Sequence, residues 1–115
     1  RRLRSSERGG MSHACELETS MMLAIRPELV EMEKAVRDMS YQTSKYLPPR
    51  DFYYPTGPII MMPYWSTMSR TGTLGDPTKA TREKGERWLS AAVQGLTGII
   101  KEFRGLEIKE RVDHH

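Results

Sequence analysis

The sequence predicts one domain of mixed α/β class, and three observations support this prediction. Two segments, residues 14–26 and 81–104, carry apolar side chains at helical spacing. A short apolar run at residues 59–62 has the length and composition of a buried strand. The chain of 115 residues is long enough to bury one core and too short for two domains.

The first helix is predicted over residues 14–26. Its apolar stripe recurs at helical spacing and consists of Leu17, Met21, Ala24 and Ile25. Glu16 and Glu18 fall in the first turn, where carboxylates interact favourably with the helix dipole. The helix is expected to end before Pro27, because a proline pushes the preceding residue out of helical geometry. We interpret Glu16 as a solvated acid and Cys15 as a small buried side chain. A nucleophilic Cys15 is disfavoured because no oxyanion loop accompanies it.

The middle of the chain predicts little regular structure. Residues 27–30 are expected to form one helical turn, and residues 31–37 alternate imperfectly, as in a short strand. Residues 38–58 contain prolines and aromatic side chains but little periodicity, and a connection of this length is usually functional or flexible. Residues 59–62 are assigned to a buried strand, with Met61 and Met62 in the core. A glycine-rich turn region follows at residues 71–77.

The last helix is the clearest element and is predicted over residues 81–104. Its broad apolar stripe consists of Trp88, Leu89, Ala92, Val93, Leu96, Ile99, Ile100 and Phe103. Thr78 or Thr81 can cap its start, and Glu83 lies in its first turn. Gly105 stands where a helix commonly stops.

Composition and charge argue against several classes of function. The chain carries 18 basic and 15 acidic residues, for a net charge of +3. No nucleic-acid-binding motif accompanies its basic N-terminus, so we interpret residues 1–10 as a flexible segment and expect no nucleic-acid partner. One cysteine cannot form an internal disulfide, and no apolar run approaches the ~20 residues of a membrane span. Because no signal peptide is visible, we expect a cytoplasmic protein without a membrane partner.

His13 is the candidate residue for acid–base or metal chemistry. It is the only histidine before a C-terminal tail at residues 107–115, whose His114 and His115 are either native or the stub of a purification tag. From spacing alone, His13 and Glu18 project in different directions from a helix, which favours a capping histidine. The alternative is that both side chains face one cavity. The glycines at 72 and 75 match no common phosphate-binding loop.

Two ordered motifs in the chain resemble the creatininase family (creatinine amidohydrolase and its relatives). The first is His13-Ala14-Cys15-Glu16-Leu17-Glu18-Thr19-Ser20, followed by Met22-Leu23 and Arg26-Pro27-Glu28-Leu29-Val30. The second is Gly72-Thr73-Leu74-Gly75-Asp76-Pro77, followed by Ala80-Thr81-Arg82-Glu83-Lys84-Gly85. The resemblance spans residues 9–104 and corresponds to the C-terminal half of such a protein.

The resemblance implies a three-layer α/β/α fold around a mostly parallel sheet, with residues 11–106 as its C-terminal half. In the family, the N-terminal half supplies Glu, His and Asp metal ligands and a glycine-rich loop. Because one interior histidine cannot build a dinuclear metal site, we expect the N-terminal half of the enzyme as a partner on a separate chain. The family further implies a homo- or hetero-oligomer, with a hexamer as one arrangement.

The resemblance also implies roles for single residues. His13 matches the family's catalytic histidine and is expected to act as general acid/base. Glu18 matches a glutamate that faces the metal centre, as a ligand or as a hydrogen-bond acceptor for one. The implied cofactors are divalent metal ions, two per site, with Zn, Mn and Fe as candidates. Trp65 and the loop at residues 41–54 are expected to line the substrate pocket.

The resemblance therefore implies part of a metal-dependent amidohydrolase that is active only when its other half is present. The expected substrate is a small or cyclic amide, a formamide or a short peptide-like amide. Creatinine itself is disfavoured, because Ser12 replaces an acidic residue of creatininase proper and residues 75–77 also differ from it. The alternative is a catalytically inactive structural or interaction subunit that keeps the fold. In either case the isolated chain is expected to fold poorly, with one sheet face uncovered.

Overall fold

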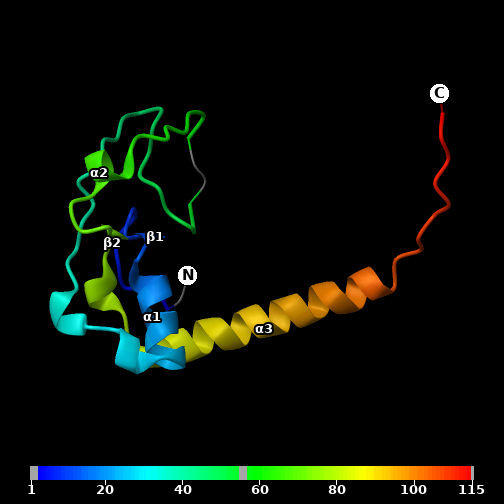
Figure 1. Cartoon of the computed structure of the whole chain (residues 1–115), viewed down its shortest axis with the longest axis horizontal. Coiled ribbons are helices and arrows are strands. Elements are labelled where there is room, and N and C mark those ends of the chain that lie inside the picture. The colour runs from blue at the N-terminus through cyan, green and yellow to red at the C-terminus, as the bar shows by residue number, and fades with distance from the viewer. Residues whose placement is uncertain (1–2, 55–56, 115) are drawn as a thin grey trace.

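In the computed structural model, which describes residues 3–54 and 57–114, a small sheet and two helices meet at one end of an elongated molecule (Figure 1). Its principal extents are 55 × 35 × 25 Å. Helix α1 (Glu16–Ile25) lies beside the sheet, and the start of helix α3 (Arg82–Arg104) packs against α1. The predicted mixed α/β class is therefore confirmed.

The sheet consists of two short antiparallel strands that bring the two sequence motifs together. Strand β1 (Met11–His13) pairs with β2 (Leu74–Gly75), with Met11 opposite Gly75. Gly75 has a φ of +139°, and a Cβ there would lie 2.7 Å from the carbonyl oxygen of Gly10, so only glycine fits. This pair is antiparallel, whereas the resemblance implied a mostly parallel sheet. The three-layer arrangement stays a prediction for a complete domain.

Helix α1 forms close to where its apolar spacing predicted it. Cys15 occupies the N-cap position, and its backbone N–H donates to the Glu18 carboxylate at 3.4 Å. The helix ends at Ile25, and the predicted single turn follows as a 3₁₀ helix at Pro27–Leu29. The strand predicted over residues 31–37 is wrong. A second 3₁₀ turn forms at Met32–Lys34, because the imperfect alternation offers no apolar side for a sheet to bury.

The predicted strand at residues 59–62 is also wrong. These residues form an exposed irregular segment, and the Met62 side chain is 83% exposed. Met61 and Met62 therefore do not belong to the core. Prolines flank the run on both sides, and the described part of the chain provides no strand that pairs with it. A four-residue helix, α2 (Trp65–Met68), follows directly.

Helix α3 confirms the prediction for residues 81–104, although little of its apolar stripe is buried. The Thr81 hydroxyl caps the helix by accepting from the backbone N–H of Lys84 at 3.3 Å. The first turns pack on α1, and Trp88 is buried there. The rest of the helix projects from the body (Figure 1), which leaves Val93, Leu96, Ile99, Ile100 and Phe103 exposed. Among residues 3–54 and 57–114, no helix combines the length and apolarity needed to cross a bilayer.

The core is small and lies between α1, β1 and the start of α3. Its buried apolar centre consists of Met11, Cys15 and Trp88. Partly buried side chains pack around that centre, namely Leu3, Leu17, Met21 and Tyr53. Buried polar groups complete the contact between the helices: the Ser20 hydroxyl accepts from the backbone N–H of Thr81 at 3.1 Å. The second sequence motif is thereby attached to the first.

Candidate functional site

His13 stands at the end of β1, at a pocket of about 390 Å³. Its ring meets the ring of Trp65 edge-on, with centroids 4.7 Å apart and planes at 79°. The other walls come mainly from Leu47, Pro48, Arg50, Asp51, Phe52, Ile59, Ile60, Met61 and Met62. The structure thus brings together two predicted site residues, His13 and Trp65, with part of the loop at 41–54. An apolar pocket with a few polar groups is the usual form of a small-molecule site.

The turn from β1 into α1 separates the His13 side chain from the core. Ala14 has a φ of +46°, in the left-handed region, which costs residues other than glycine about 1–2 kcal/mol. Strand pairing before this turn and the buried start of α1 after it hold the unfavourable conformation in place. His13 remains exposed while Cys15 is fully buried. This burial confirms the interpretation of Cys15 as a small buried side chain, and it raises the pKa of the thiol.

Glu18 lies on a different side of the same turn. It lines a separate hollow of about 320 Å³, together with residues of α1 and the 3₁₀ turns, and His13 does not line that hollow. Its carboxylate accepts the N–H of Cys15 and completes the cap of α1. The structure therefore does not bring Glu18 and His13 into one pocket, and its contacts within this chain are those of a helix cap.

The described residues do not by themselves fit the two-metal site that the resemblance implies. Within ranges 3–54 and 57–114, no three His, Cys, Asp or Glu side chains converge closely enough to hold a metal ion. His13 and Glu18 could each offer one ligand, but from different hollows. A two-metal site needs several such side chains around ions ~3.5–4 Å apart.

Glu16 is fully buried, so its interpretation as a solvated acid is wrong. Its carboxylate accepts from the Lys84 ammonium at 2.6 Å and from the backbone N–H groups of Ser5 and Ser6 at 2.8 and 2.7 Å. Burial by itself raises the pKa of this carboxyl, but the hydrogen bonds from Lys84 and Ser6 outweigh burial and lower the pKa below its usual value. Glu16, on α1, therefore links the N-terminal segment to the start of α3. Sequence spacing contained no signal for this convergence.

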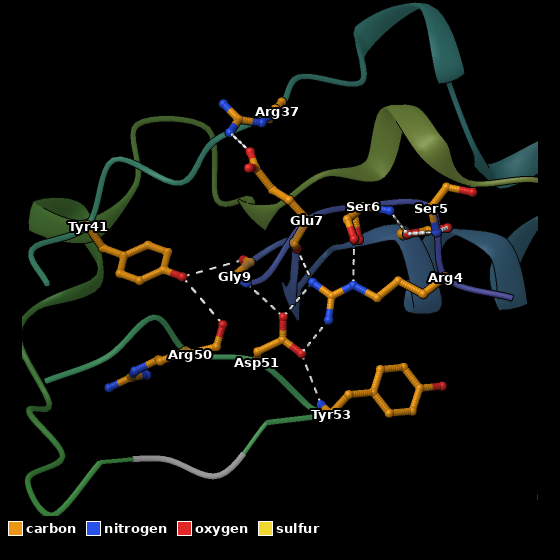
Figure 2. A network of polar contacts seen from close by, with 11 residues as sticks. Arg4, Ser5, Ser6, Glu7, Gly9, Arg37, Tyr41, Arg50, Asp51 and Tyr53 are labelled. Carbon is orange, nitrogen blue, oxygen red and sulfur yellow. Dashed lines mark hydrogen bonds and ion pairs between the residues drawn. The ribbon is translucent and has the colours of Figure 1, made fainter. Parts of the chain in front are cut away.

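A second buried ion pair supports the pocket wall (Figure 2). Arg4 donates two hydrogen bonds to the Asp51 carboxylate, at 2.9 and 2.7 Å. The same carboxylate accepts the backbone N–H groups of Gly9 at 2.7 Å and Tyr53 at 3.0 Å. The backbone N–H of Phe52, which follows Asp51 in the chain, donates to the carbonyl oxygen of Met11 in β1 at 2.9 Å. Asp51 thus attaches the loop to the strand that carries the candidate site.

The N-terminal segment, residues 1–10, makes several of these contacts. Arg4 and Gly9 hydrogen-bond to Asp51, Ser6 hydrogen-bonds to Glu16, and Gly9 and Gly10 are buried. That the segment is flexible stays a prediction. Tyr41 contributes from the loop: its hydroxyl lies 3.4 Å from the Gly9 carbonyl oxygen and 3.3 Å from that of Arg50 (Figure 2). Burial, and then the negative charge of Asp51, raise the pKa of Tyr41. Arg1 and Arg2 lie outside the described residues.

Comparisons with known proteins agree with the two sequence motifs. The family model described as creatinine amidohydrolase matches residues 1–100. The creatinine amidohydrolase of Pseudomonas putida is 36% identical over 92 residues, which cover 80% of this chain and 31% of that protein. A solved structure from Bacteroides fragilis NCTC 9343, provisionally named a creatinine amidohydrolase, has a TM-score of 0.70 and 28% identity; the match covers 94% of this chain and 40% of that one. The chain therefore spans less than half the length of these relatives, and it belongs to the creatininase family.

Proposed function

We propose that this chain contributes the proton-transfer group to a site that hydrolyses a C–N bond in a small amide. The single observation that carries the proposal is the exposed imidazole of His13 beside Trp65 at the mouth of an apolar pocket. A small or cyclic amide, or a formamide, is of a size for a pocket of about 390 Å³. Family membership supports the reaction class, since the Pseudomonas putida relative is named for creatinine hydrolysis.

In this proposal His13 is the general acid/base. Breaking an amide bond requires a proton on the departing nitrogen, and histidine is the side chain that most often supplies one. The edge-on contact with the Trp65 ring limits how the imidazole can turn at the pocket that both residues line. Trp65 also offers an apolar face on which the substrate can pack.

Divalent metal ions, two per site and of Zn, Mn or Fe type, form part of the same proposal. When bound, they would supply an activated water and polarise the scissile carbonyl. Because the described residues hold no group of ligands, most of those ligands would come from polypeptide outside them. His13 and Glu18 are the residues of this chain that could reach toward the ions.

The missing ligands lead to a proposal about the partner. We infer that the N-terminal half of the family fold completes a three-layer α/β/α domain and covers the exposed stripe of α3. The exposed stripe and the two-stranded sheet support this inference, because both leave apolar or hydrogen-bonding surface without a neighbour among the described residues. A cytoplasmic homo- or hetero-oligomer, with a hexamer as one arrangement, belongs to the same proposal.

Creatinine is not the substrate we favour. Ser12 precedes His13 and lines the same pocket, where an acidic residue would have offered a partner for a cationic or amidine-like group. Ser12 carries no charge, and the one carboxylate along the described pocket lining, that of Asp51, is already paired with Arg4. The alternative function, an inactive structural subunit, is favoured only by the lack of a metal-ligand group within the described residues.

Metal analysis of the purified assembly, combined with an amidase assay, decides between these two functions. We expect about one to two ions per site, and amide hydrolysis that disappears on chelation and returns when the metal is restored. The matched variants are His13→Ala, which should slow amide hydrolysis about 10²–10⁴-fold, and His114→Ala, which removes an exposed tail histidine and should leave the rate unchanged. A metal-free assembly whose stability does not change with a chelator, and which cleaves no amide, would support the structural role instead.

A further inference from the structure

Three basic side chains are partly buried within the described residues, namely Arg4, Arg50 and Lys84. Arg4 is paired with Asp51 and Lys84 with Glu16, both at hydrogen-bonding distance. Arg50 has no carboxylate partner anywhere in residues 3–54 and 57–114. The contacts of its guanidinium are exposed, so this group is accessible from solvent and is available to an anionic ligand.

The hydrogen bonds of Arg50 leave most of its donors free. One terminal nitrogen donates to the Met61 carbonyl oxygen and lies 3.5 Å from the Met62 sulfur, which is a weak acceptor. A guanidinium has five N–H donors, and the described part of the chain supplies no other acceptor for them. Figure 2 shows the Arg50 side chain directed away from the Arg4–Asp51 pair, so it does not share that carboxylate.

The position of Arg50 relates it to the candidate site. It lies between a smaller hollow of about 180 Å³ and the pocket of about 390 Å³ that His13 and Trp65 line. Asp51 is the one acidic residue along the larger pocket, and Arg4 and backbone N–H groups already occupy its oxygens. The pocket therefore combines one imidazole and one available guanidinium with apolar walls from Phe52, Ile59 and Ile60.

We propose that Arg50 binds a carboxylate of the substrate, and that the substrate is an N-acyl α-amino acid with an apolar side chain. This inference rests on the proposed function and specifies its substrate class. A carboxylate matches the two parallel N–H groups of a guanidinium, and a branched or aromatic side chain matches the apolar walls. The carboxylate and the scissile nitrogen are one carbon apart in such a molecule, so Arg50 would place that nitrogen in the pocket that His13 shares.

The reaction balances without any further reactant. The oxygen of water forms a bond to the acyl carbon, and the C–N bond breaks. The departing nitrogen receives one proton from His13, which regains a proton from the attacking water. The products are a carboxylic acid and a free amino acid, whose carboxylate remains on Arg50 until release.

The test compares N-acetyl-leucine with N-acetyl-leucinamide, which differ only in the carboxylate, as substrates of the assembled protein. From the strength of hydrogen bonds to charged groups, we expect kcat/KM for N-acetyl-leucine to exceed that for N-acetyl-leucinamide about 10- to 100-fold. Arg50→Gln should reduce this ratio to less than about threefold. Arg50→Lys should give an intermediate ratio, because lysine keeps the positive charge but cannot donate two parallel hydrogen bonds to the carboxylate. Arg87→Gln, which removes an exposed arginine outside the pocket, should keep the wild-type ratio. An unchanged ratio in Arg50→Gln, or a wild-type protein that prefers N-acetyl-leucinamide, would overturn the proposal.

A binding measurement separates this inference from the proposed function. Calorimetric titration of both probes into His13→Ala protein reports the carboxylate preference without turnover, with and without Arg50→Gln. If binding of N-acetyl-leucine depends on Arg50 but the wild-type assembly hydrolyses no amide, the carboxylate contact stands and the proposed hydrolysis is refuted. Hydrolysis of uncharged amides with no carboxylate preference would do the reverse. A peptide ending in leucine serves as a third probe, and faster cleavage of the peptide than of N-acetyl-leucine would overturn the small-molecule assignment.

Discussion

The crossing of α1 and α3 at Gly85 makes a sharp prediction about stability. Gly85 is buried in the first turns of α3, where the backbone of α1 passes directly over it. A Cβ at this position would lie 1.9 Å from the backbone oxygen of Ser20 and 2.5 Å from its carbonyl carbon. Ordinary carbon–oxygen contacts begin near ~3.3 Å. Gly85→Ala therefore requires the two helices to separate by roughly 1.4 Å.

The magnitude follows from two opposing effects. Alanine is favoured over glycine inside a helix by about 1 kcal/mol. Forcing extra volume into a packed contact costs about 1–3 kcal/mol, occasionally more. Here the obstacle is backbone and cannot rotate away, and the nearby Ser20–Thr81 hydrogen bond would lengthen with the helices. These obstacles place the packing cost at about 3 kcal/mol and add about 1 kcal/mol for the weakened hydrogen bond. After the gain of about 1 kcal/mol from helix propensity, we expect a net loss of about 3 kcal/mol in the free energy of unfolding.

Gly95→Ala and Gly98→Ala are matched controls in the same helix, because a Cβ at either position meets nothing within 4 Å. Each should stabilise the protein by about 0.5–1 kcal/mol through helix propensity alone. Urea denaturation of the assembled protein, followed by circular dichroism, measures all three variants. If Gly85→Ala is as stable as Gly95→Ala, the close approach of α1 and α3 described here does not exist.

Three further predictions concern the buried ion pairs and the exposed helix. The pKa of Glu16 is lowered in the folded protein, so its stabilising contribution is present above the ordinary value of 4.5 and is lost as the pH falls through the lower folded pKa. Glu16→Gln should lower the free energy of unfolding by about 2–3 kcal/mol at pH 7 and flatten its decline as the pH falls below 4.5; an unchanged pH profile would contradict the pairing with Lys84. Asp51→Asn should cost about 2–4 kcal/mol, because it leaves Arg4 without its buried counter-ion, and it should increase proteolysis within the loop at 41–54. The isolated 115-residue chain should bind a hydrophobic dye strongly and melt without cooperativity, since the stripe of α3 is exposed; a sharp cooperative melt would refute this.

The helices could be predicted from the sequence because their signals are local. The apolar spacing, Pro27 and the Thr81 cap all act within a few residues, and both helices form within two residues of the predicted bounds. The strands could not be predicted in this way. Strand β2 is two residues long, and its existence depends on β1, which lies more than sixty residues earlier. The run at 59–62 has strand-like composition but no partner among the described residues, so composition alone was misleading.

The candidate site was predictable only in part, for a related reason. His13 and Trp65 were both named from the sequence, and the structure places their rings in contact. The convergence of Ser5, Ser6 and Lys84 on Glu16 depends on packing between distant segments, so an acid in a first helical turn looked solvated. The same holds for Arg4 and Asp51, which are far apart in the chain. Arg50 gave no signal at all in the sequence, because its significance lies in the absence of a counter-ion within the described structure.

The central claim, that His13 delivers a proton to the departing nitrogen, can be tested by varying the leaving group. The measurement is kcat/KM of wild-type and His13→Ala assemblies on an alkyl amide and on an ester with a phenolate leaving group that needs no protonation. The account predicts that His13→Ala slows the alkyl amide by about 10²–10⁴-fold and the activated ester by less than about tenfold. Equal losses on both substrates, or no loss on either, would contradict it.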